Sequence, residues 1–370
     1  MTSETTPRIA FFTGAFGGGG IERVTANLAH GFIQRGIKVD LVVDKILDES
    51  HLLRLPPEVR VVNLKAPRLY MSLPNLVRYL QQERPVALLS ASHYVNEIAL
   101  LGRKLSGVST RLVVSEHNQL SKTVRNATKL KDRLTPLFAK HLYPWADGIL
   151  AVSQGVAVDL SLMTGLPLEQ IQVIYNPVVT PDLLENAKAP VDHPWFALGE
   201  PPVILGVGKL EEQKDFPNLL RAFAQVRQVR PARLMILGWG PDRPQLEALV
   251  QELGLEADVA MPGYQKNPYA YMAKSGVFVL SSAWEGLPTV LIEAMATGVP
   301  VVSTDCKSGP AEILDNGKYG FLTPVGDSNA LATAILNTLS GGSKQVDPAW
   351  LNQFGLETAT QQYLNILGIA

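Results

Sequence analysis

The sequence predicts an α/β protein that contains two doubly wound domains, each built on a parallel sheet. Three observations support this fold class. The chain has 370 residues, which is too long for one compact core. Short apolar runs alternate with segments of helical periodicity along most of its length. A stretch rich in Pro, Asp and Ala at 176–202 divides these segments into two series and is the best candidate for a linker.

The first series opens in the order strand, glycine loop, helix, strand. Residues 8–13 (RIAFFT) form a short apolar run that predicts a buried strand, and glycines dominate 14–20. Apolar residues have helical spacing over 21–35, Gly36 ends that helix, and 38–43 (KVDLVV) predicts the next strand. Further strands are expected at 86–89, 111–115 and 148–152.

The second series begins with the apolar run 203–207 (VILGV), which predicts another buried strand. The strands expected after it are 233–237, 259–261, 277–280 and 301–303. The helices expected between and after them are 218–229, 244–253, 289–296, 330–339 and 358–367. Ligands of such sheets bind at the carboxyl ends of the strands, so candidate site residues are sought there.

Composition excludes several classes of protein. The 46% hydrophobic content is too high for a disordered chain, and one cysteine, Cys306, cannot form a disulfide framework. No apolar run reaches the roughly 18–20 residues that span a bilayer, and the short polar segment 1–7 lacks a signal-peptide core. The net charge of -1 argues against a nucleic-acid binder. We therefore expect a cytoplasmic protein.

The charge is unevenly divided along the chain. Residues 1–190 carry 21 basic and 16 acidic side chains, whereas 191–370 carry 12 and 18. Much of the positive excess lies in 121–141, where Leu134, Leu137 and other apolar residues recur at helical spacing. A basic amphipathic helix can lie on an anionic membrane. For a cytoplasmic protein, that surface would be the inner face of the cytoplasmic membrane. A solvated helix face is the alternative interpretation.

The densest motif follows the strand predicted at 277–280. Glu285 lies in the loop, Pro288 favours a helix start, and Glu293 comes eight positions after Glu285. Eight helical steps span about 12 Å, roughly the distance from a sugar to a ribose across a diphosphate. The helix N-terminus between the carboxylates suits a phosphate. When the spacing is considered alone, the alternative to a binding site is that both glutamates are ordinary solvated residues of a helix.

In its setting EGLPTVLIEAMATGVPVV, this pair resembles the paired-glutamate motif of retaining glycosyltransferases of family 4. The resemblance implies the GT-B fold, which consists of two Rossmann-like domains facing a cleft, with the nucleotide sugar held mainly by the second. It implies an acceptor-binding domain at 1–180 and a donor-binding domain at 181–350. A C-terminal helix within 351–370 is expected to pack back toward the first domain.

Two further segments resemble donor-binding loops of the same family. In 207–216 (VGKLEEQKDF), Lys209 and Lys214 match its two basic positions and would neutralise a diphosphate as it leaves. The alternative interpretation is that both lysines are ordinary exposed residues of a loop. The segment 262–272 (PGYQKNPYAYM) resembles the loop that receives the nucleobase. Tyr264 would stack on the base, or Tyr264 and Gln265 would supply backbone contacts. Trp239, in LGWGP, departs from the polar residue usual in the family.

Two motifs of the first half also resemble the family. In GGGGIERV, Gly19 and Gly20 would let the backbone approach the donor phosphate. Alone, this glycine loop would equally suggest dinucleotide binding, with Asp40 or Asp44 as the acidic partner. In VVSEHNQ, His117 follows a predicted strand, and the resemblance implies that it forms a hydrogen bond with a hydroxyl of the donor sugar.

The resemblance therefore implies a retaining transfer of a hexosyl or N-acetylhexosaminyl group. The donor would be a nucleotide diphosphate sugar, expected to be a UDP-sugar, and the acceptor a hydroxyl of a glycan or lipid-linked molecule in polysaccharide or glycolipid biosynthesis. Glu285 would bind the donor sugar and Glu293 the ribose. The catalytic candidates are Glu285, His117, Lys209 and Lys214, and the other candidate contacts from this loop are Gly286, Leu287, Pro288 and Thr289.

No metal and no cofactor besides the sugar nucleotide are expected, because the sequence has no Asp-X-Asp triplet and no Cys/His cluster. Two alternative functions remain open. One is a UDP-sugar epimerase or hydrolase on the same fold, and the other is a non-catalytic protein that binds nucleotide sugars. Incubating labelled donors with and without acceptor separates these three functions.

Overall fold

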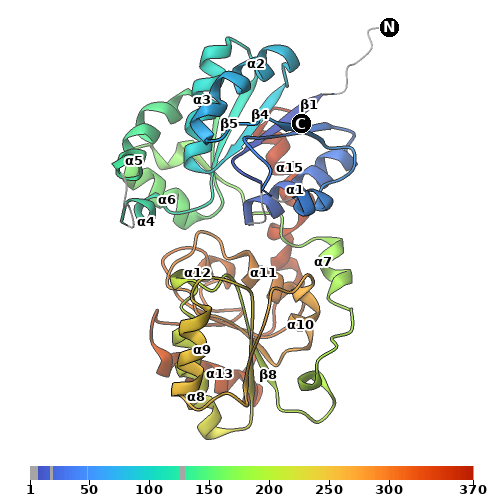
Figure 1. Cartoon of the computed structure of the whole chain (residues 1–370), viewed down its shortest axis with the longest axis vertical. Coiled ribbons are helices and arrows are strands. Elements are labelled where there is room, and N and C mark those ends of the chain that lie inside the picture. The colour runs from blue at the N-terminus through green and yellow to red at the C-terminus, as the bar shows by residue number, and fades with distance from the viewer. Residues whose placement is uncertain (1–6, 17–19, 48, 126–129, 370) are drawn as a thin grey trace. The chain divides into compact units, whose positions relative to one another are not determined.

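The computed structural model describes residues 7–16, 20–47, 49–125 and 130–369. The chain forms two compact units, one made of residues 1–178 with 353–370 and the other of 179–352. Each unit contains a parallel sheet packed against helices, so the predicted α/β fold class with two doubly wound sheets is confirmed (Figure 1).

The sheet of the first unit has the order β3-β2-β1-β4-β5-β6-β7. Its strands are β1 (Arg8–Thr13), β2 (Lys38–Val43), β3 (Arg60–Asn63), β4 (Ala87–Ala91), β5 (Arg111–Glu116), β6 (Gly148–Ala151) and β7 (Ile171–Val173). Its helices are α1 (Gly20–Gln34), α2 (Leu73–Glu83), α3 (His93–Ser106), α4 (Leu120–Arg125), α5 (Leu130–Leu142), α6 (Gln154–Thr164) and α15 (Leu356–Ile366). Because all neighbouring strands are parallel, their carboxyl ends share one edge.

The sheet of the second unit has the order β10-β9-β8-β11-β12-β13, again parallel throughout. Its strands are β8 (Val203–Val207), β9 (Arg233–Leu237), β10 (Val259–Gly263), β11 (Val277–Leu280), β12 (Val301–Thr304) and β13 (Phe321–Thr323). Its helices are α7 (Pro181–Asn186), α8 (Phe216–Val229), α9 (Arg243–Glu252), α10 (Pro268–Lys274), α11 (Thr289–Ala296), α12 (Pro310–Ile313), α13 (Ser328–Asn337) and α14 (Pro348–Leu351).

The C-terminal helix α15 is part of the first unit, where it packs on α1. Gly31 makes this close approach possible, because a Cβ at that position would lie 2.1 Å from Oγ1 of Thr360. The end of α15 is also fixed by Arg111, whose Nε donates to the carbonyl of Ile366 at 2.8 Å. In Figure 1, α15 lies beside α1 on one side of the sheet, while α2 and α3 lie on the other.

The chain passes from one unit to the other at Val178–Val179. Most of the Pro-rich stretch predicted as a linker therefore folds with the second unit, where Thr180 caps α7 through its hydroxyl. The short strands β3, β7 and β13 were not predicted from the sequence. They have three or four residues each, and β3 is partly exposed, so they lack the continuous apolar run that marks a central strand.

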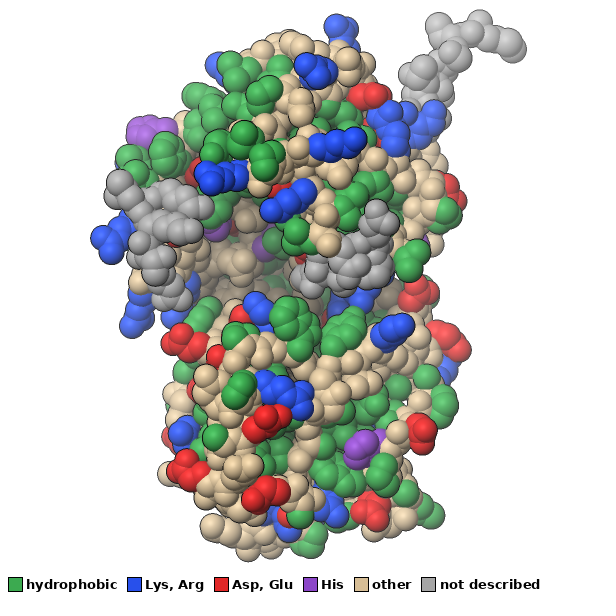
Figure 2. All heavy atoms as spheres, viewed as in Figure 1, with side chains coloured by type: hydrophobic (Ala, Val, Ile, Leu, Met, Phe, Trp, Pro, Cys, Tyr) green, Lys and Arg blue, Asp and Glu red, His purple; other side chains and the backbone are tan. Residues whose placement is uncertain are grey.

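The two units differ in charge as well as in topology. The first carries 20 basic and 15 acidic side chains, and the second 13 and 19. On the face shown in Figure 2, acidic side chains gather mainly on the unit formed by residues 179–352. The uneven charge seen along the sequence is therefore a difference between two folded units.

Asp40 lies in the middle of β2 and is fully buried. Its carboxylate accepts hydrogen bonds from Arg8 Nη1 at 2.6 Å, from Arg60 Nε at 3.0 Å and from the Tyr79 hydroxyl at 2.7 Å. Burial acts to raise the pKa of Asp40, but the hydrogen bonds from Arg60 and Tyr79 and the nearby positive charges outweigh it and lower the pKa. Asp40 thus serves this internal ion network and is not available to a dinucleotide ribose.

Replacing Asp40 with Asn should lower the free energy of unfolding by about 3–5 kcal/mol at pH 7, because the change leaves two guanidinium groups without their buried anion. The lowered pKa of Asp40 means that its contribution is complete above the unfolded-state pKa of about 4 and is lost as the pH falls further. Urea unfolding at pH 7 and pH 3.5 measures both effects. Glu58→Gln, at an exposed position, is the control, and an equal loss in both variants would contradict the account.

Candidate functional site

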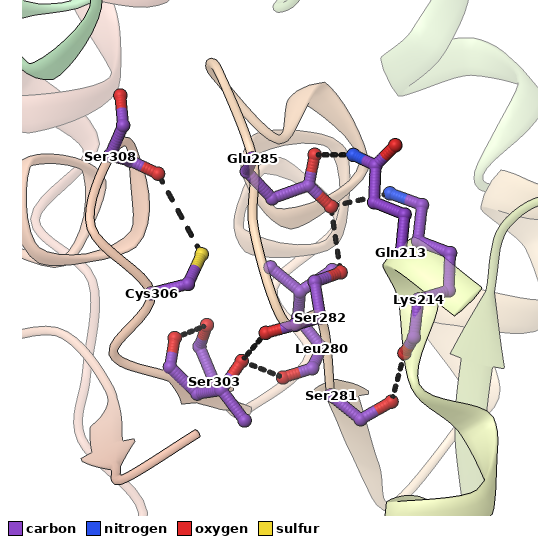
Figure 3. A network of polar contacts seen from close by, with 10 residues as sticks. Gln213, Lys214, Leu280, Ser281, Ser282, Glu285, Ser303, Cys306 and Ser308 are labelled. Atoms are coloured by element: carbon purple, nitrogen blue, oxygen red, sulfur yellow. Dashed lines mark hydrogen bonds and ion pairs between the residues drawn. The ribbon is translucent and has the colours of Figure 1, made fainter. Parts of the chain in front are cut away.

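The carboxyl edge of the second sheet brings two of the predicted residues, Glu285 and Lys214, into one network (Figure 3). Glu285, in the loop after β11, is 7% exposed. Its Oε1 accepts hydrogen bonds from Lys214 Nζ at 2.5 Å and from Ser282 Oγ at 2.7 Å, and its Oε2 accepts one from Gln213 Nε2 at 3.1 Å. A buried carboxylate is stable there because a cation and two neutral donors surround it.

Backbone contacts hold the two loops of this network together. The Ser281 hydroxyl donates to the carbonyl of Lys214 at 2.7 Å, and the amide of Ala283 donates to the carbonyl of Gln213 at 2.8 Å. From the next strand, the Thr304 hydroxyl donates to the carbonyl of Ser282 at 2.6 Å. The loops after β8 and β11 therefore form a single structure, and the position of Glu285 is fixed from both sides.

The local sequence explains how Lys214 reaches Glu285. Residues Glu212–Lys214 form a single 3₁₀ turn, and Asp215, with φ of 44°, then caps α8 by accepting from the amide of Asn218. A Cβ at Gly208 would lie 3.1 Å from the Lys214 side chain, so glycine there leaves room for the lysine stem. The chain thus turns tightly and directs Lys214 toward the β11 loop.

Lys209 is placed differently from Lys214. Half of its side chain is exposed, its Nζ lies 2.7 Å from a Glu211 oxygen, and the same nitrogen lies 6.0 Å from the centre of the Trp239 ring. The structure therefore joins Lys214, but not Lys209, to the network of Glu285. Lys209 is a solvent-facing cation at the same sheet edge.

Two exposed aromatic residues extend this edge across the neighbouring strands. Trp239 follows β9 and Tyr264 follows β10, and both side chains are more than half exposed. The loops after β8 and β9 are held together by the amide of Leu210, which donates to the carbonyl of Trp239 at 2.9 Å. The amide of Gly238 donates to the carbonyl of Gly263 at 3.0 Å. Gln265 is half-buried, and its amide nitrogen lies 3.5 Å from the carbonyl of Pro262.

The segment between the two glutamates is mostly buried. Gly286, Leu287 and Pro288 are buried, whereas Thr289 begins α11 and is half-buried. The Ser308 hydroxyl donates to the carbonyl of Gly286 at 2.8 Å and fixes the segment from the side. Glu293, in the body of α11, is 2% exposed. Glu293 is therefore not a solvated helix carboxylate, which was the alternative that the spacing alone left open.

In the first unit, His117 follows β5 and is half-buried. Its Nε2 lies 3.1 Å from Oγ of Ser115. Burial lowers the pKa of His117 to about 4, so the ring is neutral at physiological pH. Gly20 begins α1 and is exposed, and a Cβ there would meet nothing within 4 Å. Gly19 lies outside the described residues.

Beside His117 lies a buried polar network that sequence analysis did not find. Glu116 is 1% exposed and accepts hydrogen bonds from the Tyr143 hydroxyl and from Nδ2 of Asn96, the latter at 3.1 Å. Burial raises the pKa of Glu116 to about 8, although both hydrogen bonds oppose this. The only sequence signal was an acidic residue ending an apolar strand, directly before the histidine.

The described residues contain neither a candidate metal site nor a candidate membrane span. Among them, no group of three or more His, Cys, Asp and Glu side chains is arranged to hold a metal ion. Within the same ranges, no helix is long and apolar enough to cross a membrane.

Known protein families match nearly the whole chain. The family model described as "Glycosyltransferase Family 4" matches residues 18–181, and "Glycosyl transferases group 1" matches 192–349. A relative from Campylobacter jejuni is 32% identical over 346 residues, which are 90% of each chain. It is named N-acetylgalactosamine-N,N'-diacetylbacillosaminyl-diphospho-undecaprenol 4-alpha-N-acetylgalactosaminyltransferase. The chain belongs to glycosyltransferase family 4.

Solved structures agree with this assignment. The apo form of the lipopolysaccharide outer core galactosyltransferase WaaB is 25% identical, with a TM-score of 0.76 over 98% of this chain and 99% of that one. Anabaena HepE in complex with UDP-glucose is 21% identical, with a TM-score of 0.78 over 98% and 100%. The protein is therefore a family 4 glycosyltransferase with the GT-B fold, as the motif resemblance predicted.

For this family 4 member, sequence analysis identified Glu285 and Lys214 but missed the side chains that position them. Gln213 directly precedes Lys214 and was not considered, because a lone amide in a loop carries no signal by itself. Ser282 precedes Glu285 by three residues in the same loop, and Thr304 ends β12, where its hydroxyl donates to the Ser282 carbonyl. A lone hydroxyl in either place carries no sequence signal by itself.

The different burial of the two lysines predicts different effects on stability. Lys214→Met should lower the free energy of unfolding by about 2 kcal/mol, because Glu285 then lacks its cation in a buried site. Lys209→Met should change it by less than about 0.5 kcal/mol, since its ion pair is half exposed. Urea unfolding of the two variants gives the comparison. Equal effects would contradict the assignment of Lys214 alone to the Glu285 network.

Proposed function

We propose that the protein transfers a hexosyl or N-acetylhexosaminyl group from a UDP-sugar to a hydroxyl of a glycan or lipid-linked acceptor, with retention at the anomeric carbon. The observation that carries this proposal is the Glu285 carboxylate, buried at the carboxyl edge of a parallel sheet and joined to Lys214. The names of similar proteins support it, since one is an N-acetylgalactosaminyltransferase and another binds UDP-glucose. The polyprenyl diphosphate in the first name favours a lipid-linked acceptor.

The donor would bind the second unit, so that residues 181–350 act as the donor domain and 1–180 as the acceptor domain. Lys214 and Lys209 would neutralise the diphosphate, one from inside the network and one from the solvent. Amides at the start of α11, near Thr289, would add hydrogen-bond donors. Glu293 would bind the ribose hydroxyls, and Tyr264 with Gln265 the base. In the first unit, Gly20 and Gly19 would leave room for the donor.

Chemically, the bond between the anomeric carbon and the phosphate oxygen breaks, and a bond to the acceptor oxygen forms. The acceptor proton passes to the leaving phosphate, so no separate protein base is needed. Negative charge develops on the diphosphate, and the lysines stabilise it. Glu285 would orient the sugar through its hydroxyl groups, with Gln213 and Ser282 keeping its carboxylate in place. His117 would donate a hydrogen bond to a sugar hydroxyl.

A peripheral contact with an anionic membrane is part of the proposal. On α5, Leu137 and Phe138 are 51% and 44% exposed, and the basic side chains of Arg133 and Lys140 on the same helix are exposed too. Apolar side chains beside cations are the composition of helices that lie on anionic bilayers. This surface would keep the protein at the cytoplasmic face of a membrane that carries the acceptor.

Glu285→Gln, Lys214→Ala and Lys209→Ala should each lower the rate of sugar transfer by about 10²–10³-fold while the protein stays folded, because each removes charge or hydrogen bonds that act on the donor. Transfer is measured with a panel of labelled UDP-sugars and a lipid-linked acceptor. Glu256→Gln, at an exposed position of the same unit, serves as the control. Full activity in all three variants would overturn the assignment, and donor breakdown that needs no acceptor would indicate a hydrolase.

Binding to anionic liposomes should require the exposed apolar pair of α5. The double variant Leu137→Gln/Phe138→Gln should bind at least about tenfold more weakly. Inserting the two apolar side chains partly into the membrane should contribute more than about 1.4 kcal/mol to the binding free energy. Co-sedimentation at low and high salt measures this. The control is Leu162→Gln on α6, where the leucine is 75% exposed. Equal binding by both variants would exclude the α5 surface.

A further inference from the structure

Trp239 is an exposed aromatic residue at the carboxyl edge of the second sheet, and no step of the proposed function uses it. It lies in the turn after β9, in the motif LGWGP, and is 62% exposed. Tyr264, after the neighbouring strand β10, is 51% exposed. Ligands of parallel sheets bind at this edge, and binding sites commonly contain aromatic side chains. The indole of Trp239 is therefore a candidate for contact with a ligand.

Two glycines fix the backbone of Trp239 against the loop after β8. Gly238 has a φ of 144°, and a Cβ there would lie 1.8 Å from the carbonyl oxygen of Gly208. A Cβ at Gly240 would lie 2.2 Å from the carbonyl oxygen of Leu210. Between the two glycines, the carbonyl of Trp239 accepts a hydrogen bond from the amide of Leu210 at 2.9 Å. The exposed indole is thus carried by a backbone that is held on both sides.

The ring of Trp239 lies beside the exposed cation of this edge. Nζ of Lys209 lies over the ring, 6.0 Å from its centre, which is the outer limit of a cation–π contact. The closer partner of the same nitrogen is a Glu211 oxygen at 2.7 Å. Lys209 therefore does not depend on the indole for its charge pairing. A ligand whose phosphate binds Lys209 brings its neighbouring groups to the indole.

The strand order determines which group of a nucleotide sugar lies there. The order β11-β8-β9-β10 puts the loop of Glu285 on one side of the lysine loop. It puts Trp239 one strand away, and Tyr264 two strands away, on the other side. Neighbouring strands lie about 4.8 Å apart, so the row spans about 14 Å. Because the diphosphate of such a donor separates the sugar from the nucleoside, a sugar at Glu285 places the nucleoside toward Trp239.

The nucleobase is the part of the nucleoside that suits an exposed indole. Both groups are flat π systems, and a base that stacks on an aromatic side chain gains affinity whichever base it is. The ribose instead presents hydroxyl groups, whereas the indole has a single polar group, its N–H donor. The chemistry of Trp239 therefore matches the base better than the ribose.

We propose that Trp239 is a further donor-binding residue, whose indole stacks on the nucleobase beside the diphosphate that Lys209 binds. This proposal rests on the proposed function, because it takes the position of the diphosphate from Lys209 and Lys214. Trp239 supplies affinity for the face of the base. Recognition of the edge of the base is left to Tyr264 and Gln265.

Isothermal titration calorimetry with UDP and with inorganic pyrophosphate separates stacking from charge. Trp239→Ala should bind UDP about tenfold more weakly than the unsubstituted protein does. The same variant should bind pyrophosphate within about twofold, because pyrophosphate has no base. Trp239→Phe should bind UDP within about threefold, since it keeps a flat ring. Unchanged UDP binding in Trp239→Ala, or equal weakening of both ligands, would overturn the proposal.

Trp145→Ala is the matched control. Trp145 is 38% exposed, and Nζ of Lys104 lies 5.2 Å from the centre of its ring, but this pair belongs to the first unit. Its loss should leave the affinity for UDP within about twofold. Thermal unfolding without ligand shows that both alanine variants are folded.

Tryptophan fluorescence gives a readout that a merely structural role would not change. The chain has five tryptophans, and stacking on a base quenches the emission of the indole involved. UDP should quench the emission of the unsubstituted protein and of Trp145→Phe. It should not quench that of Trp239→Phe, although this variant still binds UDP. Quenching that persists in Trp239→Phe would exclude the stack.

Failure of this proposal and failure of the proposed function give different results. If the unsubstituted protein binds neither UDP nor UDP-N-acetylgalactosamine, the proposed function fails, and the role of Trp239 fails with it. If the unsubstituted protein binds both ligands and Trp239→Ala binds UDP equally well, only the role of Trp239 fails.

Discussion

The buried ion pair between Glu285 and Lys214 is the interaction on which the candidate donor site depends. The Glu285 carboxylate is 7% exposed, and such a group is stable only when it is paired and hydrogen-bonded. Lys214, Gln213 and Ser282 meet this need. In doing so they join the loop after β8 to the loop after β11. The same contacts that stabilise the fold thus hold a rigid anion and a cation at the carboxyl edge of the sheet.

The position of this pair follows from the topology. In the order β10-β9-β8-β11-β12-β13, β8 and β11 are neighbours, although 69 residues separate the end of the first from the start of the second. Their loops lie where the sheet order reverses, and open parallel sheets bind ligands at this point. The exposed Lys209, Trp239 and Tyr264 continue the edge along β8, β9 and β10. The proposed nucleotide sugar would lie along this edge, with its charge near Lys214 and its base toward the aromatic surface.

Much of this could be predicted from the sequence. Buried central strands such as 203–207 and 277–280 were found at their observed bounds, because buried parallel strands are uninterrupted apolar runs. Family resemblance singled out Glu285 and Lys214, which the structure joins in an ion pair. The partial exposure of Lys209 and the Glu116 network were not found, because they depend on tertiary neighbours. Pattern analysis detects periodicity and motifs, but a short edge strand such as β3 provides neither.

The affinity of UDP compared with that of a UDP-sugar tests the central claim most directly, because it separates the diphosphate contacts from the sugar contacts of Glu285. Isothermal titration calorimetry of the unsubstituted protein and of Glu285→Gln, each with UDP and with UDP-N-acetylgalactosamine, gives four dissociation constants. The account predicts that Glu285→Gln binds UDP within about threefold of the unsubstituted protein and loses the additional affinity for the UDP-sugar. If both forms bind UDP-sugar equally well, or if neither ligand binds the unsubstituted protein, Glu285 is not the sugar-binding carboxylate of this site.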